Sequence, residues 1–278
     1  MRHALLVLFA ASLFSAGAPK VINEGYGDFL IVPAGNFKMG DSFGDGDARE
    51  RPVHQVYLDT FYIAKFEVTN GDWKRFQNDP AYNDTKLWPG GRVVPKDQSP
   101  YWTMAVNHGG GTPDSDNYPV LGVNWDAATA YCNWLSRKTG KKYRLPTEAE
   151  WEKAARGTDQ RRFPWGNTID YDHANYAGAQ KYDTVKQVGS YPKGASPYGV
   201  MDMAGNVQEW CQDWYSRNYY ESSPKKNPTG PEKGAYKVLR GGSFFIEGQD
   251  LRSYARSAGW PSLYAWRMIG FRAARSAE

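Results

Sequence analysis

Glycine and proline recur along the whole of this 278-residue chain, with 29 Gly and 17 Pro. Because glycine adopts turn conformations easily and proline interrupts helices, this distribution limits helix length and predicts many irregular connections. Aromatic residues make up 15% of the chain, and each buried ring contributes a large apolar area to a core. We therefore expect a loop-rich α+β protein with a sizeable core rather than a helical bundle.

Short strands are predicted in the first quarter of the chain. Residues 29–40 read as a strand interrupted by a turn at residues 33–35, and residues 53–58 alternate like a half-buried strand. Further short strands are expected at residues 238–240 and 269–274. Residues 80–118 are polar and rich in Gly, Pro and Asp, which predicts a long loop.

Three helix starts carry capping signals. Thr69 or Asn70 can cap a short helix, and Asn124 or Asp126 can begin an amphipathic one. Thr147 stands three positions before a glutamate, as in a capping box, and predicts a helix that ends at Gly157. Because no second hydrophobic block follows a linker, we expect a single domain over residues 29–275.

The N-terminal segment resembles a secretory signal. A positive start at Arg2 is followed by an apolar run at residues 4–14 and small residues at 15–18. This order predicts a signal peptide over residues 1–18 and an exported protein, in the periplasm, at the cell surface or secreted. An N-terminal apolar strand is the alternative. The run is too short to span a bilayer, so we expect no transmembrane segment in the mature chain.

Charge and cysteine content exclude few functions. The formal net charge is +4, and acidic and basic residues are interspersed, so we expect no nucleic-acid partner. Cys132 and Cys211 can form one bridge in an oxidising compartment or remain as buried thiols. The four histidines are scattered and have no metal-ligand spacing.

Seven motifs occur in a fixed order along the chain. They are residues 67–70 (EVTN), 119–125 (PVLGVNW), 144–152 (RLPTEAEWE), 164–167 (PWGN), 203–210 (MAGNVQEW), 240–243 (RGGS) and 270–272 (GFR). Together they make the chain resemble the formylglycine-generating-enzyme (sulfatase-modifying factor) family. The resemblance implies a C-type-lectin-like fold, in which small sheets carry many loops. The motifs also have structural roles. Trp151 is expected in the core, and Glu150 and Glu152 are expected to face the partial positive charge of the helix N-terminus. Gly241 and Gly242 are expected in a tight turn.

The resemblance also defines what this chain lacks. Enzymes of the family carry two cysteines shortly after the position of Ser243, and these bind copper as thiolates. This chain has no cysteine after Cys211, so we expect no copper and no formylglycine-generating activity. Trp210 and Ser243 match groove-lining positions of the enzyme. Cys132 matches a position of a structural disulfide whose partner position here is Ala273, which favours two buried thiols.

Two calcium sites are implied by the same resemblance. Mixed carbonyl, amide and carboxylate oxygens suit this hard cation. The first set is Asn175, the carbonyl of Tyr176, Asp183 and the carbonyl of Val185. The second set is the carbonyls of Ala204, Gly205 and Val207 with the carboxylate of Glu209. The alternatives are that Asp183 is a turn residue and that Glu209 pairs with an arginine.

The segment after Ser243 is rich in aromatic residues and arginines, which dominate binding hot spots. Phe244 and Tyr254 are expected in the core. The candidate ligand-binding residues, which include the two groove positions named above, are Trp210, Ser243, Phe245, Glu247, Gln249, Arg256, Trp260, Tyr264, Trp266 and Arg267. A lectin-like core with such a segment also resembles the variable proteins of diversity-generating retroelements.

Two functions remain in competition. The first is a binding protein that presents residues 244–268 to a protein or another extracellular ligand. The second is a cysteine-independent periplasmic enzyme of the family, because the pyoverdine-maturation protein of pseudomonads resembles this chain in export, length and lack of the cysteine pair. Ergothioneine-type sulfoxide synthases are a poorer match, since they need a helical domain with an iron-binding histidine cluster.

Overall fold

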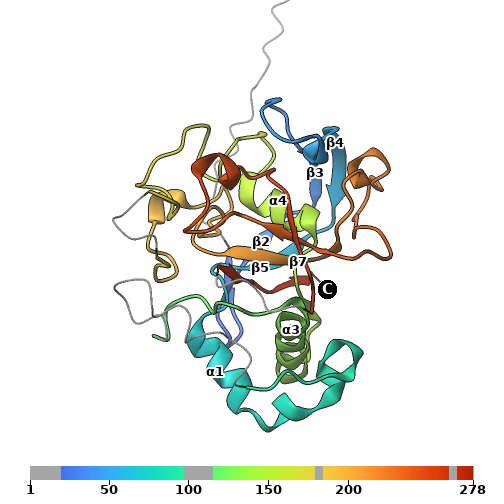
Figure 1. The fold of residues 1–278 in the computed structure, drawn as a ribbon, viewed down its shortest axis with the longest axis vertical. Coiled ribbons are helices and arrows are strands. Elements are labelled where there is room, and N and C mark those ends of the chain that lie inside the picture. The colour runs from blue at the N-terminus through green and yellow to red at the C-terminus, as the bar shows by residue number, and fades with distance from the viewer. Residues whose placement is uncertain (1–19, 97–114, 179–183, 263–267, 278) are drawn as a thin grey trace, which may run out of the picture.

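The computed structural model describes residues 20–96, 115–178, 184–262 and 268–277. The expected signal segment, residues 1–18, lies outside them. In the described part, three β-sheets and three α-helices are joined by long connections (Figure 1). The fold is α+β, as the sequence predicts. None of the described helices is long and apolar enough to cross a bilayer.

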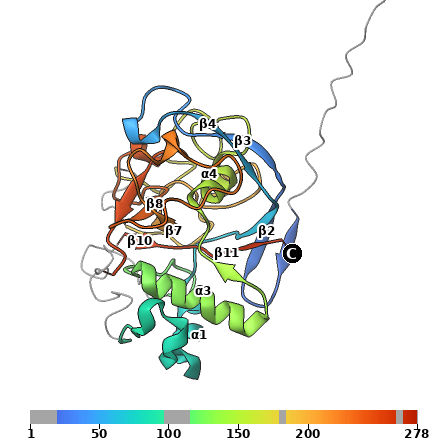
Figure 2. The same ribbon diagram turned by 90° about the vertical axis from the view of Figure 1, so that its right-hand side faces the viewer.

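The largest sheet joins the two ends of the described chain. Its five strands pair antiparallel throughout. In spatial order they are β1 (Val21–Asn23), β2 (Asp28–Val32), β5 (Phe61–Ala64), β11 (Ala274–Ser276) and β6 (Tyr143–Arg144). The last strand, β11, lies between β5 and β6, so the C-terminal segment is built into the sheet interior (Figure 2).

A second sheet carries the motifs around Glu209 and Arg240. Its order is β10 (Ile269–Gly270), β7 (Gln208–Trp214), β8 (Lys237–Arg240) and β9 (Ser257–Gly259). β10 runs parallel to β7, and the other pairs are antiparallel. The apolar run at residues 269–274 therefore supplies strands to two different sheets. β3 (Gly35–Met39) and β4 (His54–Leu58) form a separate two-stranded sheet.

The three described α-helices begin where the sequence places their caps. They are α1 (Asn70–Asn78), α3 (Trp125–Thr139) and α4 (Glu148–Arg156). The side chains of Thr69, Asn124 and Thr147 each accept a hydrogen bond from the backbone of the first turn. Gly157 ends α4 with a φ of 69°, in the left-handed region.

The described start of the expected loop at residues 80–118 is more regular than the sequence predicts, and residues 97–114 lie outside the described part. Three short 3₁₀ helices follow α1 directly: η2 (Pro80–Asn83), η3 (Thr85–Leu87) and η4 (Pro89–Gly91). Asp79 and Asp84 cap the first two by accepting from Ala81 N and Lys86 N. The aspartates that made this segment look like a loop thus cap short helical turns. The amino-acid composition averaged over the segment does not reveal such positions. The other 3₁₀ helices are η1 (Ala48–Glu50), η6 (Pro192–Gly194), η7 (Tyr219–Glu221) and η8 (Gly248–Leu251).

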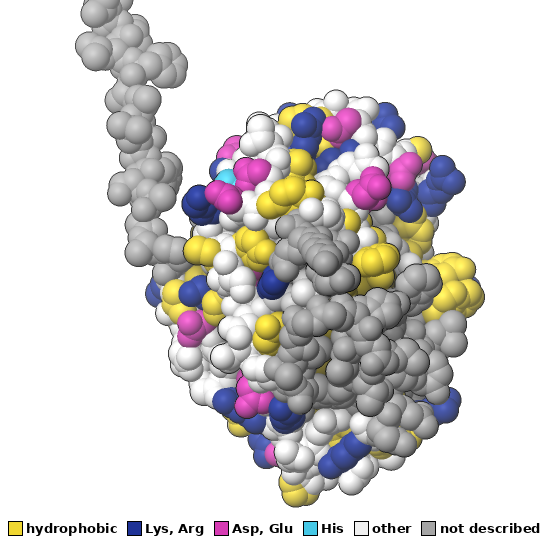
Figure 3. Space-filling model, turned by 60° about the vertical axis from the view of Figure 1, so that its left-hand side comes forward, with side chains coloured by type: hydrophobic (Ala, Val, Ile, Leu, Met, Phe, Trp, Pro, Cys, Tyr) yellow, Lys and Arg dark blue, Asp and Glu magenta, His cyan; other side chains and the backbone are white. Residues whose placement is uncertain are grey.

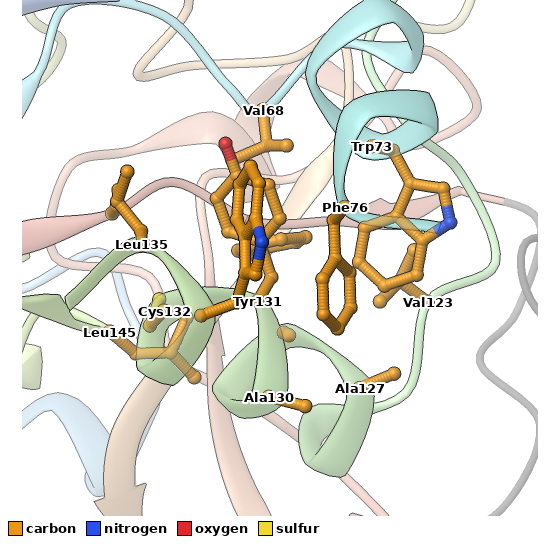
Figure 4. Packing of buried hydrophobic residues seen from close by; sticks show 14 of the residues in the cluster. Val68, Trp73, Phe76, Val123, Ala127, Ala130, Tyr131, Cys132, Leu135 and Leu145 are labelled. Atoms are coloured by element: carbon orange, nitrogen blue, oxygen red, sulfur yellow. The ribbon is translucent and has the colours of Figure 1, made fainter. Parts of the chain in front are cut away.

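Aromatic rings fill the core between α1 and α3. Trp73 and Phe76 of α1 face Tyr131 of α3 (Figure 4), with ring centroids 6.1 Å and 5.8 Å from the tyrosine ring. Phe271, from the GFR motif, closes the cluster at 5.4 Å from Tyr131. Such pairs add to the free energy gained from burial, so this end of the molecule is held largely by aromatic packing.

Helix α4 is held in a second core by buried ion pairs. Trp151 is fully buried there, as expected. Glu152, however, does not face the helix N-terminus: it lies one turn further on and accepts from Arg156 at 3.0 Å and from Arg240 at 2.5 Å. Because Glu152 is 0% exposed, its carboxylate oxygens depend on these arginines for hydrogen bonds, and tertiary contact overrides the helix-dipole expectation.

The first turn of α4 holds a second ion pair. Glu148 accepts bidentate hydrogen bonds from Arg256 at 2.7 and 2.8 Å. Burial by itself raises the pKa of Glu148, but Arg256 and Arg240 bring it below its usual value. The carboxylate is therefore ionised and paired at neutral pH.

We predict that Arg256→Met destabilises the protein by about 3–5 kcal/mol, because it leaves the Glu148 carboxylate buried without its bidentate partner. The control is Arg75→Met, which breaks an exposed pair with Asp72 at 3.8 Å and should cost no more than about 1 kcal/mol. Urea denaturation of both variants measures the difference. Equal losses would show that the buried pair contributes no more than a surface one.

Candidate ligand-binding site

A cavity of about 130 Å³ lies beside the turn that follows β8. Its walls come from η1, the first residue of β7, the turn at Gly241–Gly242 and the segment 246–257. The residues that give it chemical character are Glu50, Gln208, Ile246, Asp250, Arg256 and Ser257. The expected tight turn is confirmed, since Gly241 and Gly242 have φ values of 93° and 68°. A Cβ on Gly242 would lie 2.8 Å from Leu251 Cδ1, so the segment can fold over the turn only because glycine is there.

Glu50 is the buried acid of this cavity and is 2% exposed. Its carboxyl oxygens accept from the backbone N–H groups of Asp47 at 3.1 Å and Arg256 at 3.3 Å. Burial raises the pKa of Glu50, and the charges of Arg252 and Arg240 offset the rise only in part. A buried carboxyl group with a raised pKa in a cavity is typical of a functional site. The sequence reasoning did not select Glu50, because nothing in the acidic loop at residues 41–50 distinguishes it.

Three of the expected ligand-binding residues are buried, although one of them, Arg256, is among the residues that line the cavity. Arg256 is 2% exposed and forms the pair with Glu148, so its guanidinium supports the cavity wall from the core. Trp210 is 1% exposed and donates to Val123 O at 2.7 Å. Ser243 is fully buried, with its hydroxyl 3.4 Å from Met268 Sδ. Arginine and tryptophan are common in binding sites, but here their distant partners draw them inward.

Other expected residues do reach solvent. Phe245 and Trp260 are 60% and 51% exposed, and Trp260 packs on Tyr236 with ring centroids 4.4 Å apart. Glu247 and Gln249 are exposed, and Gln249 Nε2 donates to Glu247 Oε2 at 3.4 Å. Tyr264, Trp266 and Arg267 lie outside the described residues. Phe244 is half-buried and Tyr254 is buried, as expected of core positions.

Two further exposed aromatics come from distant parts of the chain. Phe43 stacks on Tyr254, and Tyr171 stacks on Tyr176, which packs near Gly248. We call Phe43, Tyr171, Phe245 and Trp260 the aromatic rim, because all four side chains are exposed. Phe245 precedes the cavity-lining Ile246 in the sequence, and Phe43 stacks on Tyr254 of the segment 246–257. On the face in Figure 3, hydrophobic side chains reach the surface in several separate patches. Exposed aromatic side chains are common at partner sites.

The first expected calcium set lies partly in the described residues. Asn175, Tyr176 and Val185 are buried, and Asp183 lies outside the described part. Asn175 Nδ2 donates to Thr184 O at 2.9 Å, which brings residues 175–176 alongside 184–185. The two halves of the set are thus adjacent, and their oxygen donors suit calcium.

The second expected calcium set has its carboxylate engaged by protein donors. Glu209 accepts from Arg272 at 2.7 and 2.6 Å and from the indole of Trp151 at 2.9 Å. This is the arginine pairing that the sequence left open. Among the described residues, no group of three or more His, Cys, Asp or Glu side chains has the geometry of a metal site. Ala204, Gly205 and Val207 lie in the buried turn before β7.

Copper does not fit the sulfur groups of this chain. Cys132 and Cys211 are both free and buried, as expected for two thiols without a bridge. Burial raises the pKa of each thiol, which disfavours the thiolate that copper binds. Neither cysteine lines the cavity, where Ile246 contributes an apolar wall instead.

Comparison with known proteins gives consistent results. A family model of the sulfatase-modifying factor enzyme 1-like domain matches residues 17–277. The chain is 35% identical over 260 residues to the serine/threonine-protein kinase pkn1 of Chlamydia caviae, which covers 90% of this chain but only 38% of that protein. The chain therefore spans well under half the length of that relative. It is 34% identical over 288 residues to the formylglycine-generating enzyme of Streptomyces coelicolor, covering 89% of this chain and 88% of the enzyme.

Two solved structures superpose on nearly the whole chain. PvdO from Pseudomonas aeruginosa gives a TM-score of 0.75 at 28% identity, covering 94% of this chain and 99% of PvdO. Variable protein 1 of Treponema denticola gives a TM-score of 0.72 at 25% identity, covering 94% of this chain and all of that protein.

We predict that the exposed aromatics contribute little to stability. Phe245→Ala and Trp260→Ala should each change the free energy of unfolding by no more than about 1 kcal/mol, as at other surface positions. Trp151→Ala and Trp210→Ala should cost roughly 3–5 kcal/mol, because both rings are fully buried. A denaturant series on the four variants compares the two groups. If the rim variants lose as much as the core variants, these side chains serve packing and not binding.

Proposed function

Because the chain belongs to the sulfatase-modifying factor enzyme 1-like family and has its C-type-lectin-like fold, we propose that it is an exported binding protein without formylglycine-generating activity. Its ligand is a protein or another extracellular molecule, held at the cavity and the aromatic rim. The main supporting observation is the exposure of Phe245 and Trp260 on the segment after Ser243, which also supplies several lining residues of a cavity with a buried acid. Side chains that large gain free energy when a partner covers them.

Three features support binding over catalysis by the family's chemistry. Both thiols are buried away from the cavity, the positions shortly after Ser243 hold no cysteine, and Trp210 and Ser243 are covered. Structural similarity to variable protein 1 of Treponema denticola is in line with a display role for residues 244–268.

The second candidate is the cysteine-independent periplasmic enzyme that the sequence left open. Similarity to PvdO over nearly the whole chain is the observation in its favour. Genes beside the coding sequence distinguish the two: a reverse transcriptase with a near-copy of the 3′ end favours display, and siderophore genes favour the enzyme.

We expect a random-peptide phage library selected on the mature protein to enrich peptides that bind through the rim. These peptides should lose affinity about tenfold or more for the double variant Phe245→Ala/Trp260→Ala, because hot-spot aromatics each contribute on the order of 2 kcal/mol. Val21→Ala, an exposed apolar residue on β1, is the control and should bind normally. Failure to enrich peptides, or equal binding to the double variant, would overturn the proposal.

We also expect no conversion of a sulfatase-type cysteine peptide to formylglycine, even with copper supplied. The reason is the lack of a thiolate pair near the cavity. Mass spectrometry of the peptide after incubation measures the product, with the protein omitted as the control. Turnover well above that background would place the chain among the enzymes.

We further propose structural calcium at the first set, with Asp183 completing the donors of residues 175–185. Chelation should lower the melting temperature, since an ion at 100 times its dissociation constant contributes on the order of 3 kcal/mol. Asp183→Ala should abolish this response. Asp172→Ala, an exposed acid paired with Lys193 on the same loop, should retain it. A melting temperature that is the same in calcium and in chelator would refute the site.

A further inference from the structure

Glu50 differs from the other buried acids around it in having no ionic partner. Glu148 and Glu152 are each held by an arginine at 2.7 and 2.5 Å. Glu50 is as buried as they are. Among the described residues, however, no Lys or Arg side chain forms an ion pair with it. Its carboxyl oxygens accept hydrogen bonds from two backbone N–H groups. A buried carboxyl group without a counter-ion is costly to ionise.

The arginines near Glu50 are committed to other groups. Arg256 donates to both oxygens of Glu148 and to Arg49 O. Arg240 donates to Glu152 and to the carbonyls of Ser253 and Ala255. Arg252 donates to Asp45, and Arg49 forms an ion pair with Asp47. The recorded contacts of these four arginine side chains therefore go to groups other than the Glu50 carboxylate.

The rest of the cavity suits a short side chain with a charged end. Ile246, Ala255 and the glycine turn provide an apolar wall, and Asp250 adds an exposed carboxylate. A volume of about 130 Å³ corresponds to roughly four waters at ~30 Å³ each. This is room for a small head group with part of its stem, in the way that Lys and Arg bury methylenes beneath a charged tip.

Resting on the binding role proposed above, we propose that the cavity takes a primary ammonium or guanidinium group on a short apolar stem, with Glu50 as its buried counter-ion. The ligand supplies a direct ionic partner for Glu50, whose described hydrogen bonds come from backbone N–H groups. Charge-assisted hydrogen bonds to a carboxylate that is already out of water are stronger than those made in water. Asp250 adds a second favourable charge at a more exposed position.

Binding at this site is coupled to a proton. Burial holds the pKa of the empty Glu50 above its usual value, although Arg252 and Arg240 lower it in part. A bound cation stabilises the ionised form, so binding releases a proton and the affinity rises with pH above the usual Glu range. The other charged groups around Glu50 are Arg49, Arg256, Asp41, Asp47 and Asp250.

The test uses three small probes of matched size on the full mature protein. They are Nα-acetyl-lysine amide, the uncharged Nα-acetyl-norleucine amide and the anionic Nα-acetyl-glutamate amide, titrated by ligand-observed NMR. We expect the lysine derivative to bind about tenfold or more tightly than the norleucine derivative. We also expect its affinity to increase from pH 5 to pH 8. Equal binding of these two probes, or preference for the anionic one, would overturn the proposal.

Two variants assign the effect to the cavity. Glu50→Gln keeps an acceptor for one of the two backbone N–H groups but cannot ionise, so binding of the lysine derivative and its pH dependence should both be lost. Asp250→Asn, at an exposed position, should weaken binding while leaving the pH dependence, which keeps the test valid if Glu50→Gln does not fold. Glu232→Gln, an exposed acid that is not among the cavity-lining residues, should bind as the unaltered protein. Unchanged binding by both Glu50→Gln and Asp250→Asn would place the cation elsewhere.

The outcome is separable from that of the phage selection. If peptides bind through the aromatic rim but the protein does not bind the lysine derivative, the proposed binding role stands and the cavity inference is wrong. If the lysine derivative binds in a way that depends on Glu50 but no peptide binds through the rim, the cavity inference stands and the rim is not the binding surface.

Discussion

The buried ion pairs on α4 are the interaction on which the rest of the structure depends. Glu148 and Glu152 stand four residues apart on one face of this helix and bind Arg256 and Arg240, which come from the far end of the chain. Four charged groups out of water are tolerated only when each is paired and hydrogen-bonded. The pairs therefore fix where the segment after β8 passes over the helix, and any other path would leave charges unpaired.

The same helix also fixes the N-terminal loop that completes the cavity. Gly40 donates its N–H to Glu152 at 2.8 Å and accepts from Arg156 at 2.8 Å, while Glu50 accepts from the backbone of Arg256. Segments more than 200 residues apart meet over α4, and the cavity is the space left between them. Because its supporting groups face inward, we expect the residues facing outward to contribute little to the free energy of unfolding. This division is what a binding surface requires, since its contact residues can differ without loss of the fold.

The scaffold around the turn at Gly241–Gly242 is held by packing, hydrogen bonds and an ion pair. The turn at Gly241–Gly242, the Glu209–Arg272 pair and the indole of Trp151 form one buried unit that needs no thiolate. Shortly after Ser243 this chain has Ile246, which lines the cavity together with the buried acid Glu50. The physical consequence is a site suited to hydrogen bonding and charge rather than to copper chemistry.

The sequence by itself determined the local elements and the family. The caps at Thr69, Asn124 and Thr147 depend on residues three positions away, and the motifs are contiguous, so both can be read along the chain. Tertiary structure alone decided which polar residues lie inside. Arg256 looked like a surface contact until Glu148 drew it into the core, and Glu50 looked like one acid among several until the fold placed it in the cavity without a counter-ion. The physical reason is that the burial of a charge depends on partners 108 or more positions distant, which no local pattern of residues encodes.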